Sequence, residues 1–167
     1  MIEPFLLSKV VLVGGLAVWL SIVALNNARN FAGGAASIGL MMSMRLFEDP
    51  PAIDSPLLSR RVTSPSWHKA VFGLVLGIEV LVALALWAAS LMLLGTLNGS
   101  VDSADAANTV NFALAGFLAL VFVMIWGGAW FVYYVKQEGA QITHFVLLCV
   151  ALAALIIVNF PAEGLRT

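Results

Sequence analysis

An acidic side chain stands inside a long apolar stretch of the sequence. Glu79 is the one charged residue between Ala70 and Leu97. An ionised carboxylate deep in a bilayer costs several kcal/mol, and ionisable residues there mark functional sites by default. Two interpretations stay open: a proton-carrying or counter-charge group, or a protonated carboxyl that donates a hydrogen bond to another helix or to a partner. We expect the protonated form, because burial disfavours the charged carboxylate.

The two histidines, His68 and His144, each stand at the start of an apolar stretch. In an up-and-down arrangement of four helices both starts lie on one side of the membrane, where two imidazoles could ligate a haem iron. His68 also shares a helix face with Glu79, which lies about three turns further along. We predict no cofactor, because both histidines lie near the headgroups and the C-x-x-C-H attachment motif is absent. Haem b or a quinone remains the alternative.

Two further motifs combine glycine with apolar or aromatic side chains. Gly73 and Gly77 form a G-x-x-x-G pattern, which lets a second helix backbone approach closely, and we assign it to packing within the chain. The second motif consists of Trp126, Gly127, Gly128 and Trp130. It is typical of an aromatic belt at the membrane interface, with glycines that admit a neighbouring helix. A pocket for a lipid or quinone headgroup is the alternative interpretation.

The composition indicates whether these residues lie in a soluble protein or in a membrane protein. The chain has 167 residues, of which 62% are hydrophobic and only 10% are charged. Soluble domains are about 45–50% apolar and about 25% charged, so this chain falls outside that class. Eight basic residues stand against nine acidic ones, which gives no electrostatic reason to expect nucleic acid as a partner. The sequence therefore predicts an integral membrane protein in contact with the lipid bilayer.

Four apolar stretches are long enough to cross a bilayer, which takes about 20 helical residues. We predict an all-α membrane protein, a single domain over residues 1–167, with an antiparallel bundle of helices over residues 5–27, 66–97, 109–135 and 141–160. The first is expected to be an uncleaved helix rather than a signal peptide, because no A-x-A site follows it. Residues 31–47 are short for a span, so we predict an interfacial or re-entrant helix in the long first loop. Ser64 is the expected N-cap of the second membrane helix, with Pro65 at its first position.

Several short motifs together resemble a known family. They are Ala24-Leu-Asn-Asn27, Thr63-Ser-Pro-Ser-Trp-His68, Glu79, Gly127-Gly-Ala-Trp-Phe131 and Val158-Asn-Phe-Pro161. In this order, and over nearly the whole chain, they resemble the bacterial predicted small integral membrane proteins grouped as domain of unknown function 2165. The resemblance implies four transmembrane helices, a long first loop and no established activity. It places recurring family positions at Asn27, Ser64, Pro65, His68, Glu79, Gly127, Gly128 and Trp130.

The chain departs from that family pattern at two positions. Ala129 stands where the family usually has an acidic residue, and no histidine is expected at the position of His144. The second departure further weakens the interpretation in which two histidines bind haem.

Motifs for catalysis are missing from the sequence. It has no hydrolase elbow, phosphate loop, paired metal ligands or dinucleotide fingerprint, so we predict that the protein is not an enzyme and holds no metal. Cys149, within an apolar stretch, is expected to act as a small apolar residue. We expect a non-catalytic accessory or assembly subunit that packs against a larger membrane complex, for example of respiratory or photosynthetic type. The alternatives are a haem or quinone binder that uses His68 and Glu79, and a transporter or channel subunit, which the single intramembrane charge disfavours.

The basic residues and the family resemblance disagree about orientation in the expected location, the bacterial cytoplasmic (inner) membrane. Four crossings place both termini on one side, with Lys9 and Arg166. The opposite side carries Arg29, Arg45, Arg60, Arg61, Lys69 and Lys136. The positive-inside rule favours termini that face outward. The resemblance implies the reverse, because relatives tend to carry basic residues at the N-terminus and in the second loop, and we predict that both termini are cytoplasmic.

Overall fold

The computed structural model describes residues 4–160, and every regular element in that range is helical. The four long helices are α1 (Pro4–Arg29), α3 (Pro65–Leu97), α4 (Ser103–Phe131) and α5 (Glu138–Asn159), and each is long and apolar enough to cross a membrane. They confirm the predicted all-α membrane fold. The short helix α2 (Phe31–Met42) follows α1 almost directly. Three short 3-10 turns complete the elements: η1 (Arg45–Phe47), η2 (Pro56–Arg60) and η3 (Tyr133–Val135).

Local chemistry sets where the long helices begin. α3 begins at Pro65 after Ser64, as predicted, although the Ser64 hydroxyl makes no capping hydrogen bond. α4 begins at Ser103 rather than near residue 109, so it takes up part of the predicted second loop. The reason is a side-chain cap: the Asp102 carboxylate accepts a hydrogen bond of 2.7 Å from the backbone N–H of Ala104.

Two residues in the left-handed region interrupt helices that the sequence predicts to be longer. Val132 has φ 54° and ends α4 at Phe131 instead of near residue 135. Met44 has φ 52° and separates α2 from η1, so the predicted loop helix over residues 31–47 is divided in two. A β-branched or bulky side chain rarely adopts this conformation, which explains why propensity alone did not reveal these breaks.

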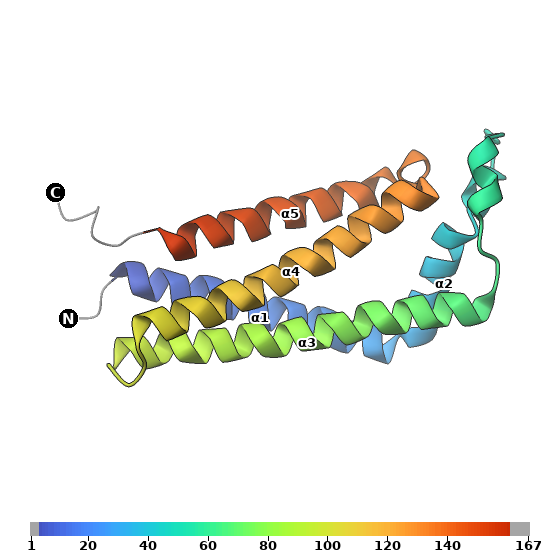
Figure 1. The fold of residues 1–167 in the computed structure, drawn as a ribbon. Coiled ribbons are helices and arrows are strands. Elements are labelled where there is room, and N and C mark those ends of the chain that lie inside the picture. The colour runs from blue at the N-terminus through green and yellow to red at the C-terminus, as the bar shows by residue number, and fades with distance from the viewer. Residues whose placement is uncertain (1–3, 161–167) are drawn as a thin grey trace.

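The four long helices form a row in which α1 packs on α3, α3 on α4 and α4 on α5 (Figure 1). The two outer helices meet near the ends that carry the termini. There the Lys9 ammonium donates hydrogen bonds to the carbonyl oxygens of Val158 (2.7 Å) and Phe160 (3.2 Å), and the Phe5 ring meets the Phe160 ring edge to face. Towards the first loop α1 and α5 diverge (Figure 1), so the bundle opens at that end.

The interior of the bundle is filled by interlocking small and large side chains. The largest side chains with almost no exposure are Val13 and Leu20 of α1, Leu86 of α3, and Val110, Leu114, Phe117, Leu120 and Val121 of α4. Buried alanines alternate with them, including Ala89 and Ala151. This core brings together all four long helices.

Helix α2 lies against the first half of α3 and covers part of the open end of the bundle. The contact depends on two glycines. The ring of Phe72 occupies the space where a Cβ on Gly34 would stand, and the Nδ1 atom of His68 lies 2.6 Å from an ideal Cβ on Gly39. The predicted loop helix therefore exists, in shortened form, and it packs on a membrane helix.

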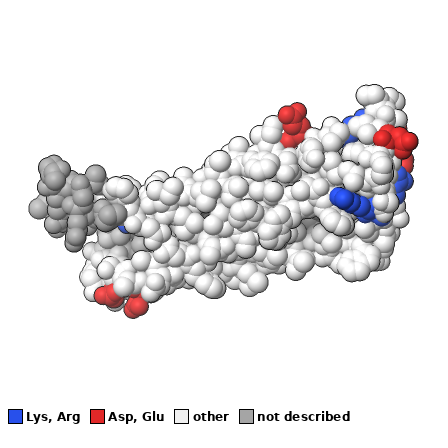
Figure 2. Space-filling model, turned by 45° about the horizontal axis from the view of Figure 1, so that its top comes forward, with Lys and Arg blue, Asp and Glu red and all other residues white. Residues whose placement is uncertain are grey.

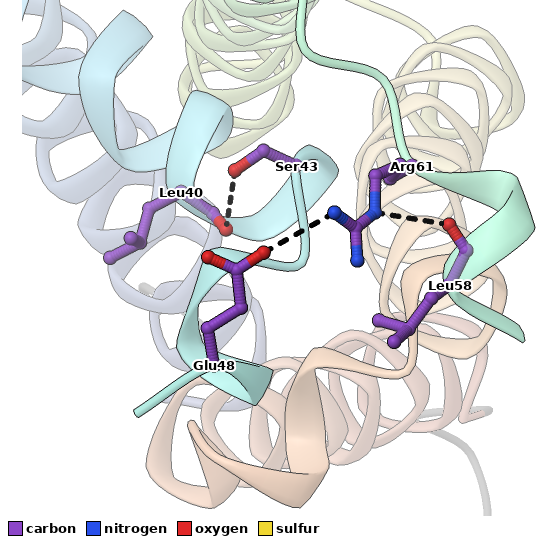
Figure 3. Close-up of polar contacts among 5 residues, drawn as sticks. All are labelled: Leu40, Ser43, Glu48, Leu58 and Arg61. Atoms are coloured by element: carbon purple, nitrogen blue, oxygen red, sulfur yellow. Dashed lines mark hydrogen bonds and ion pairs between the residues drawn. The ribbon is translucent and has the colours of Figure 1, made fainter. Parts of the chain in front are cut away.

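The rest of the first loop folds over the connection between α4 and α5. The Arg61 guanidinium donates to the Glu48 carboxylate (3.2 Å) and to the carbonyl oxygen of Leu58 (3.2 Å), which holds the two arms of the loop together (Figure 3). From beyond η3, the Lys136 ammonium donates a hydrogen bond of 2.8 Å to the carbonyl oxygen of Pro51. Exposed ion pairs contribute at most about 1 kcal/mol, so the Arg61–Glu48 pair adds little to stability.

Most charged side chains in Figure 2 lie towards the two ends of the molecule, and an acidic patch on the upper edge stands somewhat back from the first-loop end. Lys and Arg cluster at the end formed by the first loop (Figure 2). Long apolar helices with most of the charges near their ends are what a multi-pass membrane protein requires. Arg166, one of the basic residues used to predict orientation, lies outside the described residues.

Candidate functional site

Glu79 is held by an amide on the neighbouring helix. The Asn27 Nδ2 atom donates to both carboxyl oxygens of Glu79, at 2.9 Å to Oε1 and 2.8 Å to Oε2. The Glu79 side chain is 5% exposed. The carboxyl group thus accepts hydrogen bonds from another helix, whereas the protonated carboxyl predicted from the sequence was expected to donate one. Asn27 lies within the last turn of α1, so the pair is level with the end of that helix.

A polar hollow lies on the α1 and α2 side of this pair. It has a volume of about 530 Å³ and is lined by Asn26, Asn27, Asn30, Gly33, Gly34, Ser37, Ile38 and Phe72. Three of these residues are asparagines, whose amides can hold water or headgroup atoms. Little more than the Asn27 side chain therefore separates the Glu79 carboxyl group from this polar hollow.

On its other side, Glu79 lines a cavity of about 290 Å³ at the open end of the bundle, which we call the Glu79 cavity. Helices α2, α3, α4 and α5 and the turn η3 all contribute to its walls. The lining residues are Ile38, Met41, Met42, Val71, Phe72, Val75, Glu79, Val123, Met124, Gly127, Phe131, Tyr133 and His144. Apart from Glu79, Tyr133 and His144, these side chains are apolar, as in typical small-molecule sites.

Tyr133 and His144 form a second polar pair in the wall of the cavity. The Tyr133 hydroxyl lies 2.8 Å from the His144 Nδ1 atom, and the two rings meet edge to face. Burial raises the pKa of Tyr133 to about 12, so this phenol stays neutral at physiological pH. With Nδ1 engaged by the hydroxyl, the Nε2 atom of His144 makes no hydrogen bond within residues 4–160. The ring therefore has one nitrogen free for a ligand.

The structure does not bring His68 to this cavity. The His68 Nε2 atom lies 2.8 Å from the carbonyl oxygen of Val62, and its Nδ1 atom faces Gly39. His68 and His144 thus stand at the same end of the bundle, as predicted, but they have different partners. Of the two, only His144 lines the cavity. Within residues 4–160, no three His, Cys, Asp or Glu side chains are grouped in a way that could hold a metal ion.

The two glycines of the aromatic motif have opposite surroundings. Gly128 is buried, and a Cβ on it would overlap the Oε1 atom of Gln141 and lie 3.0 Å from the Tyr133 ring. Gly127 lines the cavity, and a Cβ on it would meet nothing within 4 Å. Gly128 therefore allows α5 to approach, as the sequence analysis expected, whereas Gly127 leaves room in the cavity.

The flanking tryptophans of the motif face outward. Trp126 and Trp130 are 64% and 56% exposed. The Arg60 guanidinium lies 4.7 Å from the centre of the Trp130 ring, a cation–π contact of the kind found at membrane interfaces. This placement agrees with an aromatic belt and puts neither tryptophan in the cavity.

The G-x-x-x-G motif of α3 is not a packing site within residues 4–160. A Cβ on Gly73 would lie 3.8 Å from the Phe31 ring, an ordinary contact, and a Cβ on Gly77 would meet nothing. This corrects the interpretation that the motif admits a helix of the same chain. The close approach of α1 to α3 occurs instead at Gly14, where a Cβ would lie 3.1 Å from the Ser90 hydroxyl.

Sequence reasoning missed Tyr133, Gln141 and the methionines of α2 as parts of the site. The place of Tyr133 could not be predicted, because nothing in the sequence indicates that Val132 adopts the left-handed conformation that turns the chain inward after α4. Gln141 is buried and its Oε1 atom has no hydrogen-bond partner among the described residues. A polar residue in the first turn of an apolar helix is the one signal that could have drawn attention to it.

The comparison with protein families gives one match. A family model described as "Predicted small integral membrane protein (DUF2165)" matches residues 5–161. The matched range includes α2 and essentially all of the four long helices. No curated protein and no solved structure matches the chain.

Proposed function

We propose that the chain, which belongs to the DUF2165 family of predicted small integral membrane proteins, acts as a non-catalytic accessory or assembly subunit packed against a larger membrane complex. Several polar groups that have the chemistry for catalysis make hydrogen bonds to other groups of the same chain. Asn27 binds Glu79, Val62 binds His68, and carbonyl groups at the end of α5 bind Lys9. Because these groups are held by hydrogen bonds within the chain, they support a non-catalytic role.

The observation that carries this proposal is the one-sided packing of α5. This helix packs on α4, and its outer face is lined by exposed apolar side chains such as Phe145, Val146 and Ile156. A groove on that face includes Cys149 and Ala153, two small residues one helical turn apart. Small residues at this spacing let a second membrane helix come close, which favours a helix of another protein as occupant.

Photocrosslinking from this face tests the proposal. A photoreactive amino acid at Ala153 should give a discrete protein adduct in the native membrane, because the groove would be covered by a partner helix. Leu81 of α3 is the matched control: it is 68% exposed and lies at a similar distance, roughly four turns, from the start of its helix. From Leu81 only lipid adducts are expected. Equal crosslinking patterns from Ala153 and Leu81 would contradict an accessory role. So would an adduct of twice the chain mass from Ala153, because it would contain a second copy of this chain.

For cofactors we propose that the protein holds no haem. The support is that the His68 Nε2 atom is engaged by the Val62 carbonyl and that His68 does not line the cavity with His144. The purified protein should therefore show no Soret band. A Soret band that survives stringent purification and disappears on His68→Ala would contradict this.

For location we propose the bacterial cytoplasmic membrane with both termini in the cytoplasm. Family resemblance supports this orientation, whereas the six basic residues near the first loop and the α4–α5 connection favour the opposite one. Reporter fusions after Thr167 separate the two. A cytoplasmic reporter is expected to be active there, and an active periplasmic reporter would reverse the orientation.

A further inference from the structure

We propose that the Glu79 cavity binds a neutral, membrane-soluble molecule whose compact head carries a hydrogen-bonding oxygen at each end, the chemistry of a quinone or quinol. The inference concerns a ligand and is independent of the proposed partner complex. It rests on the walls of the cavity, on two polar groups that stand on different helices, and on the space left by one glycine.

The charges around the cavity favour a neutral ligand. No Lys or Arg is among the residues that line it, so a fatty acid or another anion would meet the Glu79 carboxyl with no counter-charge. A lipophilic cation would require Glu79 to be ionised in an apolar surrounding, which is costly. A neutral molecule needs only hydrogen bonds, and the lining supplies these from Glu79 and His144.

Glu79 and His144 come from opposite sides of α4. Glu79 is on α3 and His144 is on α5, and α4 packs between these helices in the row. Asn27 uses part of the hydrogen-bonding capacity of Glu79, and Tyr133 uses one nitrogen of His144. Each residue keeps a donor for a ligand oxygen: the protonated Glu79 carboxyl group has its O–H, and the His144 ring, whose Nδ1 accepts from the Tyr133 hydroxyl, has its N–H at Nε2. Two such groups on different walls match a head with an oxygen at either end.

The apolar walls and the volume suit the ring of such a head. Phe72 and Phe131 offer aromatic faces, and Met41 and Met124 offer flexible, polarisable side chains that adapt to a ligand. The volume of about 290 Å³ is near the lower end of ligand pockets, so it holds a compact head while an apolar tail extends into lipid.

Gly127 provides the sharpest test of this site. A side chain at this position would enter space that is free of atoms within 4 Å of its Cβ and that borders the cavity. Gly127→Leu should therefore fill the cavity without displacing a neighbouring helix. Gly77→Leu is the matched control, because Gly77 also has nothing within 4 Å of an ideal Cβ but faces away from the cavity, on the exposed side of α3.

The experiment measures binding of a decyl-substituted benzoquinone to the full chain in detergent by native mass spectrometry. Decanol and dodecyltrimethylammonium serve as comparison probes of similar tail length. We expect one bound quinone per chain and weaker retention of both comparison probes. Gly127→Leu should weaken quinone binding at least tenfold, whereas Gly77→Leu should stay within twofold of the unaltered protein.

Two further variants distinguish hydrogen bonding from simple filling of space. His144→Phe keeps an aromatic ring but loses the free nitrogen, and it should weaken quinone binding by about tenfold. Glu79→Gln keeps a donor and an acceptor without charge, and it should change quinone binding by less than threefold. The unfolding midpoint of each variant shows that it is folded.

Three results would overturn the proposal. The first is quinone binding no tighter than decanol binding. The second is a Gly127→Leu variant that folds and binds the quinone as the unaltered protein does. The third is tighter binding of dodecyltrimethylammonium together with its loss in Glu79→Gln, which would instead identify a site for lipophilic cations.

Discussion

The middle of the bundle and the end nearest the first loop are built from the same four helices, yet their interiors differ. In the middle, Leu86, Leu114 and Phe117 interlock with buried alanines and leave almost no exposed surface. Near the first loop the helices diverge, and α2 covers a cavity that Glu79 and His144 line. These two titratable groups are therefore found where packing is incomplete.

This difference shows how a chain of 62% hydrophobic residues can keep a polar site. In a bilayer, apolar side chains gain little from meeting each other rather than lipid, so close fit decides how tightly helices associate. The filled middle of the bundle supplies that fit. The end nearest the first loop is free to hold polar pairs, Asn27 with Glu79 and Tyr133 with His144, which fix side chains around the Glu79 cavity.

The largest expected effect comes from a cavity made in the filled middle of the bundle. Phe117 is 1% exposed and meets the Trp19 ring edge to face. Phe117→Ala should lower the free energy of unfolding by about 2 kcal/mol, less than the ~3–5 kcal/mol of a soluble core because lipid is as apolar as the interior. Met124→Ala, beside the existing cavity, should cost less than half as much. Equilibrium unfolding in detergent measures both losses, and equal losses would mean that the middle of the bundle and the end nearest the first loop are packed alike.

The hydrogen bond between Asn27 and Glu79 should contribute a smaller amount. Bonds of this kind in membranes average about 0.6 kcal/mol and reach about 1.7 kcal/mol. A double-mutant cycle with Asn27→Leu and Glu79→Leu should give a coupling energy in that range. Glu79→Gln should keep the fold and any partner, because the amide still accepts and donates. Loss of the cellular role in Glu79→Gln, at unchanged protein level and assembly, would show that the proton or the charge itself is needed.

Near neutral pH, the ionisation of Tyr133 should have the smallest effect on stability. Its pKa is raised to about 12 by burial, whereas an unfolded chain ionises tyrosine near 10. The folded protein therefore keeps a proton that the unfolded chain loses, and stability falls as the pH rises from about 10 to about 12. Below about pH 9 the difference in stability between the protein and its Tyr133→Phe variant should not change through Tyr133, and between about pH 10 and 12 the protein should lose stability relative to the variant. A difference that stays constant between about pH 10 and 12 would place Tyr133 in a solvated environment.

The sequence predicted the large elements of this fold because hydropathy over 20 residues is a strong and local signal. It also predicted that Glu79 and Asn27 are polar positions within the membrane region. It could not predict that they are partners, because that depends on the register of α1 against α3. The left-handed residues Met44 and Val132 were missed for a related reason: tertiary contacts around them, and not their own propensity, hold the backbone there.

The most direct test of the difference between filled and open regions compares Gly127→Ala with Gly128→Ala, two adjacent positions on α4. At Gly127 the new methyl group meets nothing within 4 Å, so the better helix propensity of alanine should leave the protein equally stable or up to about 1 kcal/mol more stable. At Gly128 the methyl group overlaps Gln141 and crowds Tyr133, which should cost about 1–3 kcal/mol. Equilibrium unfolding of both variants in detergent should therefore find Gly128→Ala the less stable by roughly 2 kcal/mol. Equal stabilities, or a less stable Gly127→Ala, would contradict the presence of an open cavity beside a close-packed helix contact.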